Sequence, residues 1–135
     1  MLTAAVLGSG KMGKIHAKCY RKNSRIRRVV VWSRNQDYLE FLAREKPHLV
    51  SVCLPPDLRA EVIVPALRAG AHVLCEKPLA LSLEEAKKIH IASEQFQRHV
   101  MIGYTLRFLP EIQEIKKRVK SGESTTLRES HSTIV

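Results

Sequence analysis

The chain has 135 residues, of which 44% are hydrophobic and 27% are charged. This length suits one domain, and the composition is that of a globular protein rather than a collagen-like, fibrous or disordered chain. The apolar runs are far shorter than the ~20 residues of a membrane span, and no basic segment of a secretory signal precedes the first of them. Three cysteines without a CxxC pair predict neither a disulfide framework nor a zinc site. We therefore expect a cytoplasmic protein with no membrane partner and no metal.

Positive charge is concentrated near the N-terminus. The formal net charge is +10, from 23 Lys and Arg against 13 Asp and Glu, and residues 1–36 contain nine basic side chains and no carboxylate. Such a stretch attracts phosphate, on a small ligand or on a nucleic acid, although a charge run is more often a solvated surface. We expect no nucleic-acid partner, because aromatic residues make up only 5% and no helix-turn-helix or RNP-type motif is present.

Short β-branched runs alternate with amphipathic stretches along the chain, which is typical of βα units around a mainly parallel sheet. We predict strands over residues 4–7, 26–32, 49–54, 72–75 and 100–104. We predict helices over residues 11–22, 37–46, 58–69, 83–98 and 109–120. The fold class is therefore α/β.

Local signals mark several of the predicted boundaries. Gly70 is expected to stop the third helix, and Ser82 and Glu85 have the spacing of a capping box at the start of the fourth. Residues 125–135 are again β-prone and look like the first strand of a further domain. We therefore predict one domain over residues 1–122 and the beginning of another over residues 123–135.

Gly8-Ser9-Gly10-Lys11-Met12-Gly13 joins the first predicted strand to the first predicted helix, the context in which a GxGxxG motif is informative. Gly8 permits a tight turn, Gly10 lets a pyrophosphate approach the backbone, and Gly13 lets the helix approach the strand. The free amides and the dipole of the helix N-terminus favour a diphosphate. The alternative is a glycine-rich turn that binds nothing, but the order of strand, motif and helix favours a dinucleotide site.

The second predicted strand is followed by Ser33 and Arg34, about 20 residues after the glycines, where a dinucleotide fold commonly has a carboxylate for the ribose 2′-hydroxyl. A carboxylate repels a 2′-phosphate, whereas a hydroxyl beside a guanidinium binds one through charge-assisted hydrogen bonds. We therefore predict NADP as the cofactor, with NAD as the alternative. The other interpretation of Arg34 is an ordinary surface arginine at a strand end.

A second motif, Glu76-Lys77-Pro78-Leu79-Ala80, follows the fourth predicted strand. Four other segments accompany it: the glycine motif with His16, the run Val52-Cys53-Leu54-Pro55-Pro56, residues 66–75 and residues 103–110. Together they resemble the Gfo/Idh/MocA family, the glucose–fructose oxidoreductase and inositol dehydrogenase group. The similar segments occur in the family's order and are spread over nearly the whole chain.

The resemblance implies a doubly wound parallel-sheet Rossmann fold, with only the start of a second α/β domain. It implies that the diphosphate and the adjoining nicotinamide side of NAD or NADP lie along Gly8, Ser9, Gly10, Lys11 and Met12. By the same resemblance, Ser33 and Arg34 meet the adenosine ribose, and Leu54 and Pro55 flank the cofactor.

On the nicotinamide side, the resemblance implies that Glu76 and Lys77 reach the ribose and the substrate, often with a cis peptide between Lys77 and Pro78. It implies that Arg107 lies near the cofactor and the domain junction.

Chemistry alone also supports Lys77 as a catalytic residue. Hydride transfer between a hydroxyl carbon and nicotinamide needs a group that exchanges the hydroxyl proton, and a lysine does so when burial lowers its pKa towards neutrality. In isolation, Glu76 and Lys77 would be an ordinary surface ion pair. We interpret His16 as a helix-packing or capping residue, and the three cysteines as small core residues, with Cys53 and Cys75 within strands.

The chain departs from the family pattern in two places. Only 15 residues separate Ser33 from Leu49, too few for the helix, strand and helix that a family member has there. Either the outermost strand is absent, which exposes the edge of the second strand, or residues are missing from the sequence after Arg34. The second departure is at the end of the sequence. Residues 125–135 are too few to contain the substrate domain that a family member has there.

We therefore expect an NAD(P)-dependent oxidoreductase, with NADP favoured, that transfers hydride between nicotinamide and a sugar, polyol or similar secondary alcohol or ketone. The alternative, favoured by the missing half, is a non-catalytic dinucleotide-binding module or sensor. The expected partner is a small sugar-like substrate. A homo-oligomer is compatible with the family, whose members commonly associate through the second domain.

Overall fold

The computed structural model describes residues 1–122 of the chain. The chain divides into two compact units, the first from Met1 to Gly103 and the second beginning at Tyr104. The first unit ends before residue 122, where the sequence predicts a domain limit, and the predicted strand over 125–135 lies outside the described residues. The predicted division into two domains therefore stays a prediction. No helix within residues 1–122 has both the length and the apolar character that a membrane crossing requires.

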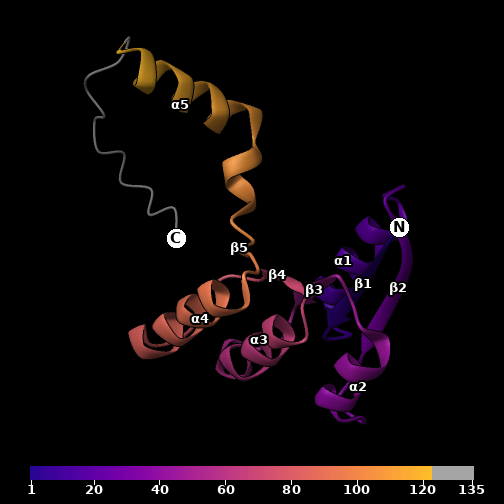
Figure 1. The fold of residues 1–135 in the computed structure, drawn as a ribbon. Coiled ribbons are helices and arrows are strands. Elements are labelled where there is room, and N and C mark those ends of the chain that lie inside the picture. The colour runs from indigo at the N-terminus through magenta and orange to yellow at the C-terminus, as the bar shows by residue number, and fades with distance from the viewer. Residues whose placement is uncertain (123–135) are drawn as a thin grey trace. The chain divides into compact units, whose positions relative to one another are not determined.

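A five-stranded parallel sheet forms the centre of the first unit, in the order β2-β1-β3-β4-β5 (Figure 1). Its strands are β1 (Leu2–Leu7), β2 (Ile26–Trp32), β3 (Leu49–Val52), β4 (His72–Cys75) and β5 (Val100–Ile102). The chain winds outward from β1 to β2 and then returns to the other side of β1 for β3. The carboxyl ends of β1 and β3 therefore flank the crevice in which such sheets bind ligands. This arrangement confirms the predicted doubly wound α/β fold class.

In the part of the chain that the structure describes, β2 is an outer strand with β1 as its neighbour. The segment between β2 and β3 forms one helix, α2 (Tyr38–Glu45), and no strand. The described chain therefore has no outermost strand at this edge, and both sequence interpretations, a lost strand or residues missing after Arg34, stay predictions. Arg28 of β2 pairs with Glu45 of α2, which ties the outer strand to this helix.

The other helices fall where the sequence predicts them, to within two residues at either end. The first unit contains α1 (Lys11–Arg21), α3 (Arg59–Arg68) and α4 (Leu83–Phe96), and the second contains α5 (Pro110–Ser121). The predicted capping box is present, because Ser82 Oγ accepts the Glu85 N–H at 3.1 Å and the Glu85 carboxylate accepts the Ser82 N–H at 3.3 Å. Gly70 has φ +89° after α3, the left-handed conformation that its predicted role as a helix stop requires.

Two strand predictions are too long. The strands predicted over residues 49–54 and 100–104 end at Val52 and Ile102. Beyond these residues the backbone turns towards two short 3₁₀ helices that the sequence analysis does not predict, η1 (Pro56–Leu58) and η2 (Thr105–Phe108).

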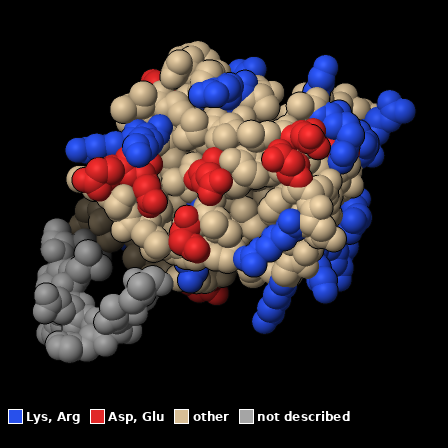
Figure 2. Space-filling model, turned by 90° about the horizontal axis from the view of Figure 1, so that it is seen from below, with Lys and Arg blue, Asp and Glu red and all other residues tan. Residues whose placement is uncertain are grey.

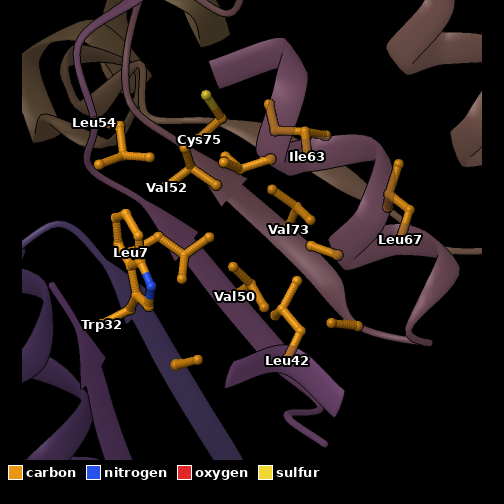
Figure 3. Packing of buried hydrophobic residues seen from close by; sticks show 14 of the residues in the cluster. Leu7, Trp32, Leu42, Val50, Val52, Leu54, Ile63, Leu67, Val73 and Cys75 are labelled. Carbon is orange, nitrogen blue, oxygen red and sulfur yellow. The ribbon is translucent and has the colours of Figure 1, made fainter. Parts of the chain in front are cut away.

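The main core lies between one face of the sheet and helices α2, α3 and α4. Alternate residues of β1, β3 and β4 point into it, as the period of two in a strand requires. Figure 3 shows the β3 and β4 side chains facing those of α3, namely Val50, Val52 and Val73 opposite Ile63 and Leu67. Truncating one such buried aliphatic side chain to alanine costs about 2–5 kcal/mol, so this layer fixes the strand ends that bear the site.

Helix α1 packs against the opposite face of the sheet, over β1, β2 and β3. Its buried residues are Gly13 and Ala17, both small. Ser51 of β3 points towards this face, because its neighbours Val50 and Val52 point into the main core. The small residues allow a close approach of helix and sheet, which brings longer polar side chains of α1 within hydrogen-bond reach of Ser51.

Candidate functional site

The turn between β1 and α1 has a shape that its glycines allow. Gly8 has φ +115°, and a Cβ there would lie 2.7 Å from the Cys53 carbonyl oxygen. A Cβ on Gly13 would lie 1.8 Å from the Gly8 carbonyl oxygen, so helix and strand approach more closely than any side chain permits. At Gly10, by contrast, a Cβ would have no atom within 4 Å. The predicted steric roles of Gly8 and Gly13 are confirmed, and the space at Gly10 is open.

The N-terminus of α1 suits an anion. Gly10 is the N-cap residue and has no side chain, and the first turn of the helix contains no acidic residue. The first amides of a helix have no intrahelical acceptor, and together with the helix dipole they favour a negatively charged group. Gly10 leaves the approach to these amides open.

A cavity of about 610 Å³ lies over this turn, at the carboxyl edge of the sheet. It brings together nine of the residues predicted to bind the cofactor, and Trp32, Asn35 and Cys53, which the sequence analysis does not name as site residues, complete its wall. The nine are Gly8, Ser9, Gly10, Lys11, Met12, Ser33, Arg34, Leu54 and Pro55. None of the lining residues is acidic. The cavity therefore offers positive charge and free amides with no carboxylate to oppose a phosphate.

The end of β2 forms one wall of this cavity. Trp32 is buried, and its indole N–H donates to the Gln36 carbonyl oxygen at 2.9 Å, which fixes the turn that follows the strand. Ser33 is half-buried in this turn, whereas Arg34 is exposed. The fixed turn thus presents the Ser33 hydroxyl and the exposed Arg34 guanidinium side by side at the cavity wall.

Basic side chains gather on the part of the molecule built from the N-terminal elements. Figure 2 shows Lys and Arg concentrated on the right-hand side, where Figure 1 has α1, α2, β1 and β2. Of the nine basic residues within residues 1–36, Lys11 and Arg34 line the cavity. The other seven do not line it and contribute to the general field that attracts anions.

Glu76 and Lys77 follow β4 and do not line the cavity. The Glu76 side chain is buried, and its backbone N–H donates to the Val52 carbonyl oxygen at 3.0 Å. The peptide between Lys77 and Pro78 is cis, as the resemblance implies. Lys77 itself is exposed. The described residues therefore do not supply the burial on which its predicted role depends, and that role stays a prediction.

A chain of hydrogen bonds connects Glu76 to α1 and β3. His16 Nε2 lies 3.1 Å from Glu76 Oε1, and His16 Nδ1 lies 3.0 Å from Ser51 Oγ. Ser51 Oγ in turn lies 2.7 Å from Tyr20 Oη. Burial raises the pKa of the Tyr20 phenol above its usual value, and the hydrogen bond between Tyr20 and Ser51 opposes this shift in part. His16 thus packs at the helix–sheet contact, as interpreted from the sequence, but it also carries a polar link that the sequence analysis misses.

Two sequence features could have revealed this network. Ser51 is a hydroxyl residue in an otherwise apolar strand, and a buried hydroxyl requires a partner. His16 and Tyr20 are four residues apart and therefore lie on one face of α1.

Arg59 is a buried arginine that the sequence analysis also misses. Its Nε donates to the Leu54 carbonyl oxygen at 2.8 Å, and its Nη1 donates to the Glu76 carbonyl oxygen at 2.7 Å. The same nitrogen donates to the Pro78 carbonyl oxygen. One guanidinium thus connects the segment after β3 to the segment after β4, and three backbone carbonyls stabilise its charge.

The cysteines differ from the prediction in part. Cys75 is buried within β4, as predicted, and burial raises the pKa of its thiol to about 11. Cys53 lies just beyond β3 at the cavity wall, and burial together with the charge of Glu76 raises its pKa to about 12. The assignment of Cys19 to the core is wrong, because this side chain is exposed on the outer face of α1.

Arg107 belongs to the second unit, within η2, where its guanidinium lies 5.4 Å from the centroid of the Tyr104 ring. Its predicted position near the cofactor stays a prediction. Within residues 1–122, no group of three or more His, Cys, Asp or Glu side chains is arranged to hold a metal ion.

The family model described as "Oxidoreductase family, NAD-binding Rossmann fold", that of Gfo/Idh/MocA, matches residues 36–104. The chain belongs to this family. The match contains Leu54, Glu76 and Lys77, whereas the glycine turn and Arg34 precede it. The stereochemistry of the glycine turn therefore supports a Rossmann fold independently of the matched segment.

Individual relatives extend the similarity over most of the chain. D-glucoside 3-dehydrogenase from Escherichia coli is 27% identical over 139 residues, which cover 90% of this chain and 40% of that protein. Inositol 2-dehydrogenase from Corynebacterium glutamicum is 34% identical over 89 residues, 65% of this chain and 26% of that protein. The chain thus spans well under half the length of these curated relatives.

Solved structures share the fold. An oxidoreductase domain protein from Kribbella flavida has a TM-score of 0.79 and 28% identity, and the similarity covers 94% of this chain and 41% of that one. Scyllo-inositol dehydrogenase from Lactobacillus casei, solved with bound NAD(H) and scyllo-inositol, has a TM-score of 0.78 and 21% identity, covering 91% of this chain and 42% of that one. At this identity the second structure supports the fold alone.

Proposed function

We propose that this chain is the cofactor-binding part of an NAD(P)-dependent oxidoreductase that transfers hydride between nicotinamide and a secondary alcohol or ketone carbon of a sugar or polyol. The observation that carries the proposal is the cavity over the β1–α1 turn. There the free helix amides and the open space at Gly10 lie beside the residues after β2 and β3 that the sequence predicts to bind the cofactor. The names of the family relatives, a glucoside and an inositol dehydrogenase, support the substrate class.

The residues present fit a dinucleotide. A diphosphate on the amides after Gly10 would need the space that a Cβ there would occupy, and this space is empty of neighbouring atoms. Ser33 and Arg34 would hold the adenosine ribose on the β2 side. Leu54 and Pro55 would provide an apolar surface on the β3 side, next to Glu76 and Lys77 beyond β4.

The preference for NADP rests on charge. Arg34 contributes a guanidinium to the cavity wall, and the wall contains no carboxylate. A 2′-phosphate would form charge-assisted hydrogen bonds with Arg34 and Ser33, whereas a ribose hydroxyl would gain little from the guanidinium. We therefore propose NADP as the preferred cofactor and NAD as the weaker ligand.

The nicotinamide ring supplies the hydride acceptor or donor when bound. Lys77 would exchange the proton of the substrate hydroxyl through its Nζ atom. Because Lys77 is exposed among the described residues, bound substrate must cover its ammonium group to bring it into the low-dielectric surroundings that this role needs.

Titration of the protein with NADPH and NADH tests the cofactor proposal. We expect NADPH to bind at least about tenfold more tightly than NADH, and Arg34→Ala to remove this difference by weakening NADPH alone. Arg27→Ala is the matched control, because Arg27 is an exposed arginine of β2 outside the cavity. Equal affinities in the unmutated protein would contradict the NADP preference. Failure to bind either nucleotide would contradict the cofactor proposal itself.

The exposure of Lys77 favours a second candidate function, that of a dinucleotide-binding module or sensor without turnover. Lys77→Met in the gene-encoded protein discriminates between the two functions. An oxidoreductase would lose turnover of its sugar or polyol substrate and retain NADPH binding. Turnover that is unchanged in this variant would remove Lys77 from the proton transfer.

A further inference from the structure

Glu76 is held from three elements, twice through its backbone and once through its side chain. Its backbone N–H donates to the Val52 carbonyl oxygen of β3, its carbonyl oxygen accepts from Arg59 of α3, and its carboxylate Oε1 lies 3.1 Å from His16 Nε2 of α1. Within residues 1–122 its second oxygen, Oε2, has no hydrogen-bond partner, and no buried side-chain oxygen among these residues lacks one. Oε2 therefore reaches solvent and is free to accept a hydrogen bond from a ligand.

The hydrogen bonds behind Glu76 have a direction. A carboxylate only accepts, so an imidazole with a single N–H at His16 donates from Nε2 to Glu76 and accepts at Nδ1. Ser51 then donates its hydroxyl to Nδ1, and Tyr20 donates its hydroxyl to Ser51 Oγ. The chain thus runs from Tyr20 through Ser51 and His16 to Glu76, and it defines both the tautomer and the orientation of the ring.

The position of Glu76 fits the nicotinamide half of a bound dinucleotide. The cavity places the glycine turn at β1, Ser33 and Arg34 at β2, and Leu54 and Pro55 after β3. β4 is the second strand from β1 on the β3 side, about 10 Å away at the spacing of neighbouring strands. If a dinucleotide has its diphosphate at the turn and its adenosine towards β2, its nicotinamide ribose extends over β3 towards β4.

We propose that His16 is a positioning residue for nucleotide binding: it holds the Glu76 carboxylate so that Oε2 accepts hydrogen bonds from the hydroxyls of the ribose nearest to β4. This inference rests on the proposed function and deepens it. Ser51 and Tyr20 support His16 by holding its ring, and their contributions are correspondingly smaller.

The two nitrogens of His16 can be tested separately. Asparagine at position 16 places an amide near the site of Nδ1 and keeps a partner for Ser51, but it is too short to reach Glu76. Glutamine extends an amide towards the site of Nε2 and keeps the contact with Glu76. A residue that merely packed α1 against β3 would tolerate the change to asparagine at least as well as the change to glutamine.

The binding of two ligands distinguishes a positioning role of His16 from a role in folding alone. NADPH contains both nucleosides, whereas 2′-phospho-ADP has the same phosphates and adenosine but lacks the nicotinamide riboside. We expect His16→Asn to weaken NADPH binding about tenfold and to leave 2′-phospho-ADP binding within about twofold. His16→Gln should retain NADPH affinity within about threefold of the unmutated protein, since it restores the donor to Glu76.

A double-mutant cycle completes the experiment. Glu76→Gln should weaken NADPH as His16→Asn does, and the double variant should be little worse than either single variant, because both remove one contact. Equal losses for NADPH and 2′-phospho-ADP, or equal behaviour of the Asn and Gln variants, would overturn the inference. Failure of the unmutated protein to bind 2′-phospho-ADP and NADPH would instead overturn the proposed function.

Discussion

Two junctions at the carboxyl edge of the sheet build the candidate site, and they are held in different ways. The turn from β1 to α1 depends on backbone contact, since the Gly8 carbonyl oxygen lies only 1.8 Å from where a Cβ of Gly13 would be. The turn after β4 depends on side chains from elsewhere in the chain. Arg59 holds its carbonyl oxygens, and His16 holds the Glu76 carboxylate.

The difference has a mechanical consequence. In the backbone contact between Gly13 and Gly8, neither partner has a side chain that can move aside. Any added atom therefore displaces α1 and with it the helix amides. Side-chain contacts of the second kind can weaken by degrees, because each donor contributes part of the support. We therefore expect all-or-none effects at the β1–α1 turn and graded effects at the turn after β4.

The largest effect is expected at the first junction, from Gly13→Ala. The new Cβ would lie 1.8 Å from a backbone oxygen, which requires movement of helix or strand. We expect the free energy of unfolding to fall by more than about 3 kcal/mol, measured by urea denaturation. A loss below about 1 kcal/mol would show that α1 yields and would contradict the rigid contact.

Gly10→Ala is the matched control for this prediction. Its added Cβ has no atom within 4 Å and Gly10 has φ −71°, so the fold should lose less than about 1 kcal/mol. The methyl group would nevertheless stand in the space proposed for the diphosphate. The variant should therefore be folded and should bind NADPH weakly.

At the second junction, Arg59→Leu removes three hydrogen bonds to carbonyl oxygens and leaves those oxygens without a donor. We expect a loss of about 2–3 kcal/mol in unfolding free energy, and a smaller loss for Arg59→Lys, whose single ammonium cannot reproduce the fork of a guanidinium. Arg68→Leu on the same helix is the control. Arg68 is exposed, with its guanidinium 5.9 Å from the centroid of the Phe96 ring, and its loss should change stability by less than about 1 kcal/mol. Similar stabilities of the Arg59 and Arg68 variants would show that Arg59 does not hold the second turn.

The same contrast explains what the sequence could reveal. The role of Gly13 is predictable, because the motif, the strand before it and the helix after it are adjacent in the chain. The role of Arg59 is not, since its acceptors lie 5, 17 and 19 residues away and are backbone oxygens that any residue provides. The link from His16 to Glu76 spans 60 residues and depends on which strands become neighbours.

Most strands and helices are predictable from the sequence because their signals, like those of Gly13, are local in the chain. The Val-rich run of β2 and the cap at Ser82 are signals within a few residues of the elements they define. The predicted ends of β3 and β5 lie too late in the chain, because apolar residues such as Leu54 continue the pattern after the strand pairing has stopped. The exposure of Cys19 is not predictable in the same way, because composition alone does not say which face of α1 is covered.

The smallest effect is expected from the cap that begins α4, after the turn of Glu76 and Lys77. Ser82→Ala removes the acceptor of the Glu85 N–H and half of the capping box, and should cost about 1 kcal/mol in unfolding free energy. Ser24→Ala, at an exposed turn, should change stability by less than about 0.5 kcal/mol. NADPH affinity should not change in either variant, because neither side chain lines the cavity. If Ser82→Ala weakened NADPH binding, the local cap would also position the turn after β4, and the division between backbone support at one junction and distant side-chain support at the other would fail.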